Sequence, residues 1–195
     1  PVGNFEIDFI ETSFEVSLRQ LQRDRVDCLL LHEAQPHDQL APLHALLERY
    51  VTNGQLGTYG SSTGEPMHQL VRFGSVLQYR CPAPGQEDSP VAPSDVLHGV
   101  LRFIAPAIGS AMESDLQLKA QLGSLLPRST DPTSATGSLA LAYALARFES
   151  RVLISTNQPK RLTDTLDQLR HITASSEWQP AMSNLHAAFE RAPAS

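Results

Sequence analysis

Polar side chains recur at the ends of the predicted strands of this sequence. His32 closes a leucine-rich run, Ser62 and Thr63 close a second apolar run, Gln78 lies in a third, and residues 155–157 form a Ser-Thr-Asn cluster. In parallel α/β folds, reactive groups collect at the C-terminal ends of strands. The four positions together therefore predict one shared site. Taken singly, each has a structural explanation, because a histidine after a strand is often only hydrogen-bonded and Ser, Thr and Asn are common in loops.

The pattern of apolar residues predicts strands that alternate with helices. The run at residues 26–32 has almost no alternation, which favours a strand covered on both faces, as in a parallel sheet. The other predicted strands are residues 56–62, 76–80 and 151–156. Predicted helices cover residues 7–23, 40–50, 66–73, 96–108, 138–148, 160–169 and 182–190, and the proline-rich stretch 82–93 is a loop. Strand, loop and helix in succession predict an α/β protein with parallel strands.

Length and composition favour a single globular domain over residues 1–195, with residues 171–195 as a C-terminal tail. The chain has 195 residues, of which 41% are hydrophobic, and a formal charge of −6 without a concentrated basic surface, so nucleic acid is not an expected partner. The apolar runs are far shorter than the roughly 20 residues of a membrane span. Cys28 and Cys81 lie far apart, which favours reduced thiols in a cytoplasmic protein without a secretory signal.

Four segments resemble one enzyme family, in that family's order. The segment 17–32, SLRQLQRDRVDCLLLH, is similar to the aldo-keto reductase helix and leucine strand that end at a catalytic histidine. The segments 54–63 (GQLGTYGSST), 76–80 (VLQYR) and 152–169 (VLISTNQPKRLTDTLDQL) are similar to three later strands and the cofactor helix. The resemblance covers roughly residues 10–170. It implies a partial (β/α)8 TIM barrel whose N-terminal strands are missing, while no seventh strand can be placed between residues 82 and 131.

The resemblance also implies roles for individual residues. His32 would lie beside the substrate carbonyl and help to polarise it, as the catalytic residue. Ser62 and Gln78 would hydrogen-bond the nicotinamide carboxamide, and Thr63 stands where the family has Asn.

At the other end of the cofactor, Arg161 occupies the position of the arginine that contacts the adenosine 2′-phosphate. Ser155 stands where many members have Lys, and Asp164-Thr165 replaces the usual Glu-Asn pair that contacts adenine. Thr156 and Thr165 complete the predicted cofactor-binding set. These residues favour NADP, with NAD possible.

The family's Asp, Tyr and Lys all precede the histidine strand, and this sequence has no counterpart of them. Tyr59 and Tyr79 do not match the family tyrosine, and we expect both to pack in the core. The resemblance thus implies an NAD(P)H-dependent reductase of aldehydes or ketones that is nearly inactive as this chain alone. We expect the open strand edges to be covered by a missing N-terminal half or by self-association.

Two other interpretations remain open. The chain could be a non-catalytic binding or regulatory protein on a degraded reductase scaffold, or an unrelated parallel α/β domain. No metal is predicted, because the remaining histidines show no ligand spacing with carboxylates or thiols.

Overall fold

The computed structural model describes residues 4–38, 41–64, 72–84, 92–127, 131–148 and 150–191. The elements, in chain order, are α1 (Ile7–Leu21), β1 (Val26–His32), a 3₁₀ turn (Pro36–Asp38), α2 (Ala41–Thr52), β2 (Leu56–Ser62), β3 (Val76–Arg80), β4 (Val96–His98), α3 (Val100–Ser114), α4 (Leu116–Ser124), α5 (Pro132–Arg147), β5 (Arg151–Val152), α6 (Pro159–Ala174) and α7 (Trp178–Arg191). The strands follow the sheet order β1-β2-β3-β4-β5. The chain divides into two compact units, residues 1–80 with 94–96 and residues 81–93 with 97–195.

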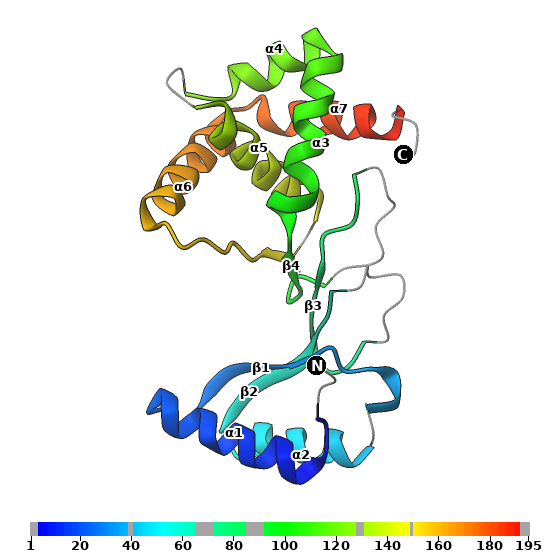
Figure 1. The fold of residues 1–195 in the computed structure, drawn as a ribbon, viewed down its shortest axis with the longest axis vertical. Coiled ribbons are helices and arrows are strands. Elements are labelled where there is room, and N and C mark those ends of the chain that lie inside the picture. The colour runs from blue at the N-terminus through cyan, green and yellow to red at the C-terminus, as the bar shows by residue number, and fades with distance from the viewer. Residues whose placement is uncertain are drawn as a thin grey trace. The chain divides into compact units, whose positions relative to one another are not determined.

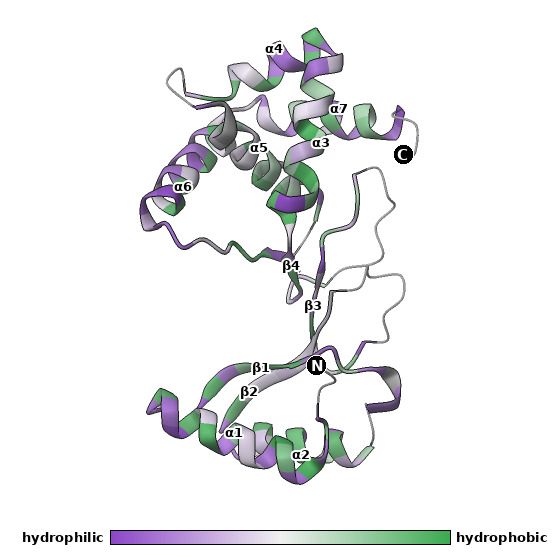
Figure 2. Ribbon diagram, in the orientation of Figure 1, coloured by the Kyte–Doolittle hydropathy of each residue, from purple (hydrophilic) through white to green (hydrophobic). Residues whose placement is uncertain are grey.

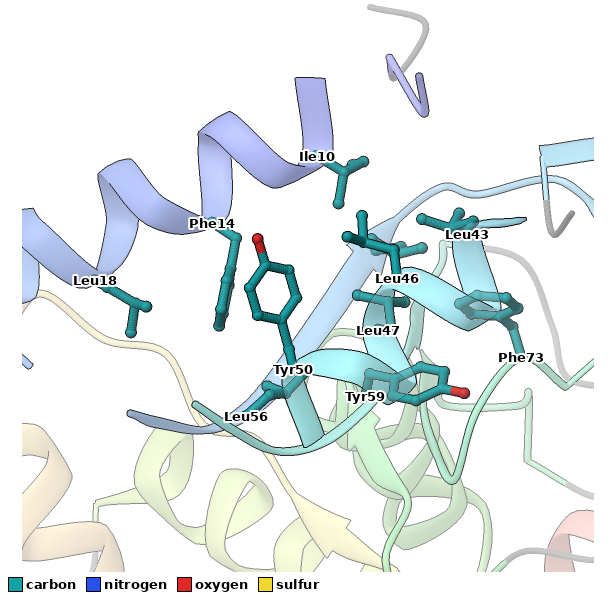
Figure 3. Close-up of a cluster of buried hydrophobic side chains, with 11 residues drawn as sticks. Ile10, Phe14, Leu18, Leu43, Leu46, Leu47, Tyr50, Leu56, Tyr59 and Phe73 are labelled. Atoms are coloured by element: carbon teal, nitrogen blue, oxygen red, sulfur yellow. The ribbon is translucent and has the colours of Figure 1, made fainter. Parts of the chain in front are cut away.

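The first unit is built by two amphipathic helices that pack on β1 and β2 (Figure 1). Ile10, Phe14 and Leu18 recur every four residues, so they lie on one face of α1, and all three are buried. Phe14 packs on Tyr50 of α2, with ring centroids 4.5 Å apart. Figure 3 shows these side chains meeting over the strands. The buried cluster consists of Ile10, Phe14, Leu18, Leu31, Leu43, Leu46, Leu47, Tyr50, Leu56, Tyr59 and Phe73.

Parallel pairing fixes the strands of the first unit in register. His32 lies opposite Ser62, and Ser62 lies opposite Gln78. Gly60 permits the close approach of β2 and β3, since a Cβ there would lie 1.6 Å from the carbonyl oxygen of Val76. A side chain at this position would push the two strands apart.

The expectation that β1 is covered on both faces is wrong. Leu31 is buried against the helices, whereas Cys28 and His32 are exposed. Successive side chains of a strand point to opposite faces, so Cys28 and His32 lie on the face of β1 opposite to Leu31. An apolar run without alternation therefore does not by itself show coverage of both faces.

The second unit packs around α5. Every residue from Leu139 to Ala144 is buried, and α5 contacts α3, α6 and α7. This core position explains the Ala- and Leu-rich sequence, because small residues allow neighbouring helices to approach from several sides. Figure 2 shows α6 largely in hydrophilic colours, and Ile172 is its one buried residue.

The predicted elements match the first unit more closely than the second. All three strands there have the predicted bounds, and α1 ends at Leu21, two residues before the predicted end. The helix predicted at 66–73 falls mostly outside the described residues, and Arg72 and Phe73 are not helical.

In the second unit, the predicted helix 96–108 begins instead with the short strand β4, and α3 begins only at Val100. The strand predicted at 151–156 has two residues, and α4 was missed. The helix predicted at 182–190 lies within α7, which begins four residues earlier, at Trp178. Within the parts of the chain that the structure describes, no helix is both long and apolar enough to span a membrane.

A buried carboxylate anchors the start of β3. Asp95 is fully buried and accepts two hydrogen bonds from Arg72, from Nη1 at 2.8 Å and from Nη2 at 2.5 Å. The backbone N–H of Leu77 donates to the same carboxylate at 2.9 Å. Hydrogen bonding to Asp95 raises the pKa of Arg72. The pair thus satisfies a buried charge and a strand N–H together.

We expect Asp95→Ala to lower the free energy of unfolding by about 3–5 kcal/mol, because it leaves the Arg72 charge and the Leu77 N–H without their acceptor. Urea denaturation followed by circular dichroism measures this change. Asp167→Ala is the matched control, since Asp167 pairs with Arg170 at 3.0 Å in an exposed ion pair and should lose about 1 kcal/mol or less. Equal effects of the two substitutions would contradict an anchoring role for Asp95.

Candidate functional site

The register of the first unit brings three of the predicted site residues together. His32, Ser62 and Gln78 occupy the same level on three adjacent parallel strands. Side chains paired across parallel strands point to the same face of the sheet, so all three project from the face opposite Tyr59 and Leu31. His32 is exposed, Gln78 is half-buried and Ser62 is buried. An imidazole, a hydroxyl and an amide therefore form a row across the sheet.

These three side chains are available for a ligand. Within the described parts of the chain, none of them takes part in a hydrogen bond through its side chain. A serine hydroxyl and a glutamine amide each donate and accept, which suits a planar amide ligand.

Glu33, which the sequence analysis did not single out, holds the loop that follows β2. Its backbone is left-handed, with φ of 57°, and its N–H donates to the carbonyl of Ser62 at 2.7 Å. Its carboxylate accepts from the Gly64 N–H at 2.7 Å and from the Thr63 hydroxyl at 3.3 Å. The sequence signal for Glu33 was a carboxylate directly after the first strand. Its hydrogen-bond partners Thr63 and Gly64 lie about thirty positions further along the chain, and the sequence pattern does not show that they contact it.

Unlike Ser62, Thr63 takes part in a hydrogen bond through its side chain. Its N–H donates to the carbonyl of Gln78 at 2.9 Å, its side chain is buried and its hydroxyl donates to Glu33. The hydroxyl hydrogen is engaged within the protein, so in this arrangement Thr63 offers a ligand only acceptor lone pairs. The contact of Thr63 with the cofactor stays a prediction, and in this arrangement Thr63 would be the hydrogen-bond acceptor in it.

The remaining predicted residues lie together in the second unit, around the start of α6. Ser155 and Thr156 are exposed in the segment between β5 and α6, three and four residues beyond the end of the short strand. The Thr156 hydroxyl accepts from the Gln158 N–H at 3.1 Å, which orders the entry to the helix. Arg161 is exposed in the first turn of α6, and Thr165 follows it one turn later.

Tyr59 of β2 and Tyr79 of β3 point to the face of the sheet opposite to His32, Ser62 and Gln78. Tyr59 is buried in the cluster shown in Figure 3, which confirms the expected core role, and its hydroxyl donates to Glu48 at 2.6 Å. His44 Nδ1 lies 2.9 Å from the same hydroxyl. Burial and the hydrogen bond to Glu48 raise the pKa of Tyr59 to about 12. Tyr79, which is also buried, neighbours Gln78 and so points to the opposite face.

Metal-ligating side chains do not gather in the described ranges. No group of three or more His, Cys, Asp or Glu residues there could hold a metal ion. Two histidines do have carboxylate neighbours that the sequence analysis missed, namely His37 beside Asp38 and His186 beside Glu190, both at 3.6 Å.

Comparison with known proteins identifies the architecture. No family model and no curated protein matches the sequence. Solved structures do match: a glycerol dehydrogenase from Gluconobacter oxydans (TM-score 0.61, 12% identity, 100% of this chain and 68% of that chain), an aldose reductase from Giardia lamblia (0.58, 15%, 94% and 69%) and an aldo-keto reductase from Bacillus halodurans (0.52, 16%, 94% and 68%). The fold is that of the aldo-keto reductases.

The match confirms the predicted partial (β/α)8 barrel, with parallel strands and alternating helices. The chain spans between 62% and 69% of the length of the aldo-keto reductase structures that it matches. At identities of 12–21%, these structures establish the fold, and the roles of the site residues remain predictions.

We expect Glu33→Ala to loosen the loop after β2, because the Gly64 N–H and the Thr63 hydroxyl lose their acceptor. Hydrogen–deuterium exchange of the Gly64 amide should become about tenfold faster or more, which corresponds to a loss of about 1.4 kcal/mol of local protection. Glu177→Ala, an exposed glutamate of the second unit, is the control. Unchanged exchange at Gly64 would show that the carboxylate does not hold this loop.

The raised pKa of Tyr59 predicts a loss of stability in alkali. The folded state holds the phenol proton more tightly than the unfolded state, whose tyrosine pKa is about 10. The stabilisation is therefore complete below pH 10 and is lost as the pH rises toward the folded value of about 12. The free energy of unfolding between pH 9 and 12 should fall less steeply for Tyr59→Phe than for the wild type. Parallel pH profiles would contradict the assignment.

Proposed function

We propose that this chain forms part of an NAD(P)H-dependent reductase that converts an aldehyde or ketone to an alcohol. The observation that carries the proposal is the row of His32, Ser62 and Gln78 on one face of adjacent parallel strands. In (β/α)8 barrels the C-terminal ends of the strands are where active sites lie. The fold supports the proposal, because aldo-keto reductases are among its structural relatives.

His32 is proposed as the residue that orients and polarises the substrate carbonyl. It ends β1 and is exposed, so its ring can reach a ligand, while the strand backbone fixes its position. A neutral imidazole N–H donates to an oxygen on which negative charge develops. The reduced nicotinamide, when bound, supplies the hydride.

Ser62 and Gln78 are proposed to bind the nicotinamide carboxamide. A carboxamide presents one acceptor oxygen and two donor hydrogens, and the hydroxyl and amide of these residues can match both. Ser62 is buried and Gln78 half-buried, so their hydrogen bonds to the cofactor would be shielded from water. The pairing of their strands would fix the orientation of the nicotinamide ring.

The start of α6 is proposed to hold the adenosine end of the cofactor. Lys160 and Arg161 place two cations in the first turn of a helix whose N–H groups also favour anions. A 2′-phosphate adds charge that these cations can bind, so the proposal favours NADP over NAD. Ser155, Thr156 and Thr165 would complete this end of the site.

His32, Ser62 and Gln78 have neither strand tyrosine on their face of the sheet as a proton donor for the alkoxide that hydride transfer produces. Tyr59 lies on the helix-facing side of the sheet and its pKa of about 12 keeps its proton at neutral pH. Neither Tyr59 nor Tyr79 shares the face of His32. A positioned proton donor contributes roughly a hundred- to ten-thousand-fold to such a reaction. We therefore expect little turnover from these residues by themselves.

Nucleotide titration tests the proposal without depending on turnover. NADP⁺ should raise the midpoint of thermal unfolding of the chain more than NAD⁺ does. Arg161→Gln should weaken NADP⁺ about tenfold and leave NAD⁺ unchanged, because it removes only the contact to the 2′-phosphate.

Ser62→Ala and Gln78→Ala should weaken both nucleotides to a similar degree. Arg170→Gln is the control, since Arg170 is exposed on the same helix and pairs with Asp167. If neither nucleotide shifts the midpoint for the wild type, the reductase proposal fails and a role that does not involve nicotinamide is favoured.

A further inference from the structure

Glu33 is hydrogen-bonded to the residues that are proposed to surround the nicotinamide, and all of them belong to the first unit. Its backbone N–H donates to the Ser62 carbonyl at 2.7 Å, and its Oε2 atom accepts from the Thr63 hydroxyl at 3.3 Å. The Thr63 N–H in turn donates to the Gln78 carbonyl at 2.9 Å. These three hydrogen bonds connect Glu33 to both residues that are proposed to bind the carboxamide, Ser62 and Gln78.

The side chain of Glu33 brings a negative charge to this end of the strands. Its two hydrogen bonds come from neutral donors, the Gly64 N–H at 2.7 Å and the Thr63 hydroxyl. Among the residues that the structure describes, no lysine, arginine or histidine forms an ion pair with Glu33. Neutral donors orient a carboxylate without cancelling its charge, so the charge remains available to act on a ligand.

The contact with Thr63 places this charge close to the proposed carboxamide site. Thr63 directly follows Ser62, and adjacent Cα atoms are about 3.8 Å apart. The carboxylate therefore lies about one residue from the hydroxyl that is proposed to hold the carboxamide. A separation of this order is shorter than the Debye length of about 8 Å at physiological salt. Ser62 and Thr63 are both buried, so water screens the charge less than it would on an open surface.

The two redox forms of a nicotinamide nucleotide differ in the charge of the ring. The oxidised ring is a pyridinium cation, the reduced ring is neutral, and the rest of the nucleotide is the same. A carboxylate beside the ring stabilises the cation by Coulomb attraction and has little effect on the neutral ring.

We propose that Glu33 is a specificity-determining residue that shifts the binding preference of the site toward the oxidised nucleotide. This role rests on the proposed function, which places the carboxamide on Ser62 and Gln78. A reductase with such a residue is inhibited by its own oxidised cofactor, so the ratio of NADP⁺ to NADPH would regulate it. Arg80, on the same face of β3 as Gln78, acts in the opposite direction. The proposal therefore concerns the contribution of Glu33, which a substitution isolates.

Isothermal titration calorimetry of the full 195-residue chain with NADP⁺ and NADPH measures this contribution. Glu33→Gln removes the charge and keeps an amide oxygen that can accept from the Gly64 N–H. It should lower the ratio of the NADP⁺ affinity to the NADPH affinity about fivefold. Glu15→Gln, which removes an exposed carboxylate of α1 in the same unit, should leave the ratio unchanged. An unchanged midpoint of thermal unfolding verifies that each variant is folded.

Two further variants separate the charge from the order of the loop. Thr63→Val removes the hydroxyl donor and keeps the charge, so it should weaken both nucleotides to the same degree and leave the ratio unchanged. Glu33→Ala removes the charge together with the loop contacts. Its ratio should fall as far as that of Glu33→Gln, even where both affinities are lower.

The outcomes distinguish the role of Glu33 from the reductase proposal. If both nucleotides bind and the ratio is the same in the wild type and in Glu33→Gln, the role of Glu33 is overturned and the reductase proposal stands. If neither nucleotide binds to the wild type, both are overturned.

Discussion

The parallel pairing of β1, β2 and β3 is the constraint on which the candidate site depends. It places His32, Ser62 and Gln78 side by side, although thirty and sixteen positions separate them along the chain. A slip of one residue in either pairing would turn a site residue toward the helices, because side chains alternate between the two faces of a strand. The close contact at Gly60 and the cluster of α1 and α2 side chains behind the strands both hold this register. The same strand register therefore determines both the packing of the core and the geometry of the candidate site.

The two faces of these strands carry different chemistry. On the helix-facing side, polar groups such as Tyr59, Glu48 and His44 hydrogen-bond one another, which rigidifies the unit and engages their donors and acceptors. On the other side, the side chains of His32 and Ser62 have no such partners among the described residues. In (β/α)8 barrels, active sites lie at the C-terminal ends of the strands, and a ligand there needs polar groups that the protein has not engaged. This contrast favours the row around His32 over the Tyr59 network as the functional site.

The sequence predicted the first unit well because its signals are local. Apolar residues four apart define α1, and a leucine run ending at His32 defines β1, so the bounds follow from periodicity. The second unit was harder. The three residues of β4 are too few to show a period, and their pairing with distant segments, such as the Leu153 N–H donating to the Leu97 carbonyl at 2.8 Å, leaves no trace in local sequence. Glu33 was missed for the same reason, since its role depends on a left-handed backbone and on partners across the sheet.

The central claim is that the row across β1, β2 and β3 faces the nicotinamide of a bound cofactor. The most direct measurement is the NMR signal of the Gln78 side-chain amide during titration with NADP⁺, with that of Gln55, at the opposite end of the sheet beside Leu56, as the internal reference. We expect a saturable shift of the Gln78 amide with little change at Gln55. Binding of NADP⁺ that leaves the Gln78 amide unmoved would contradict it.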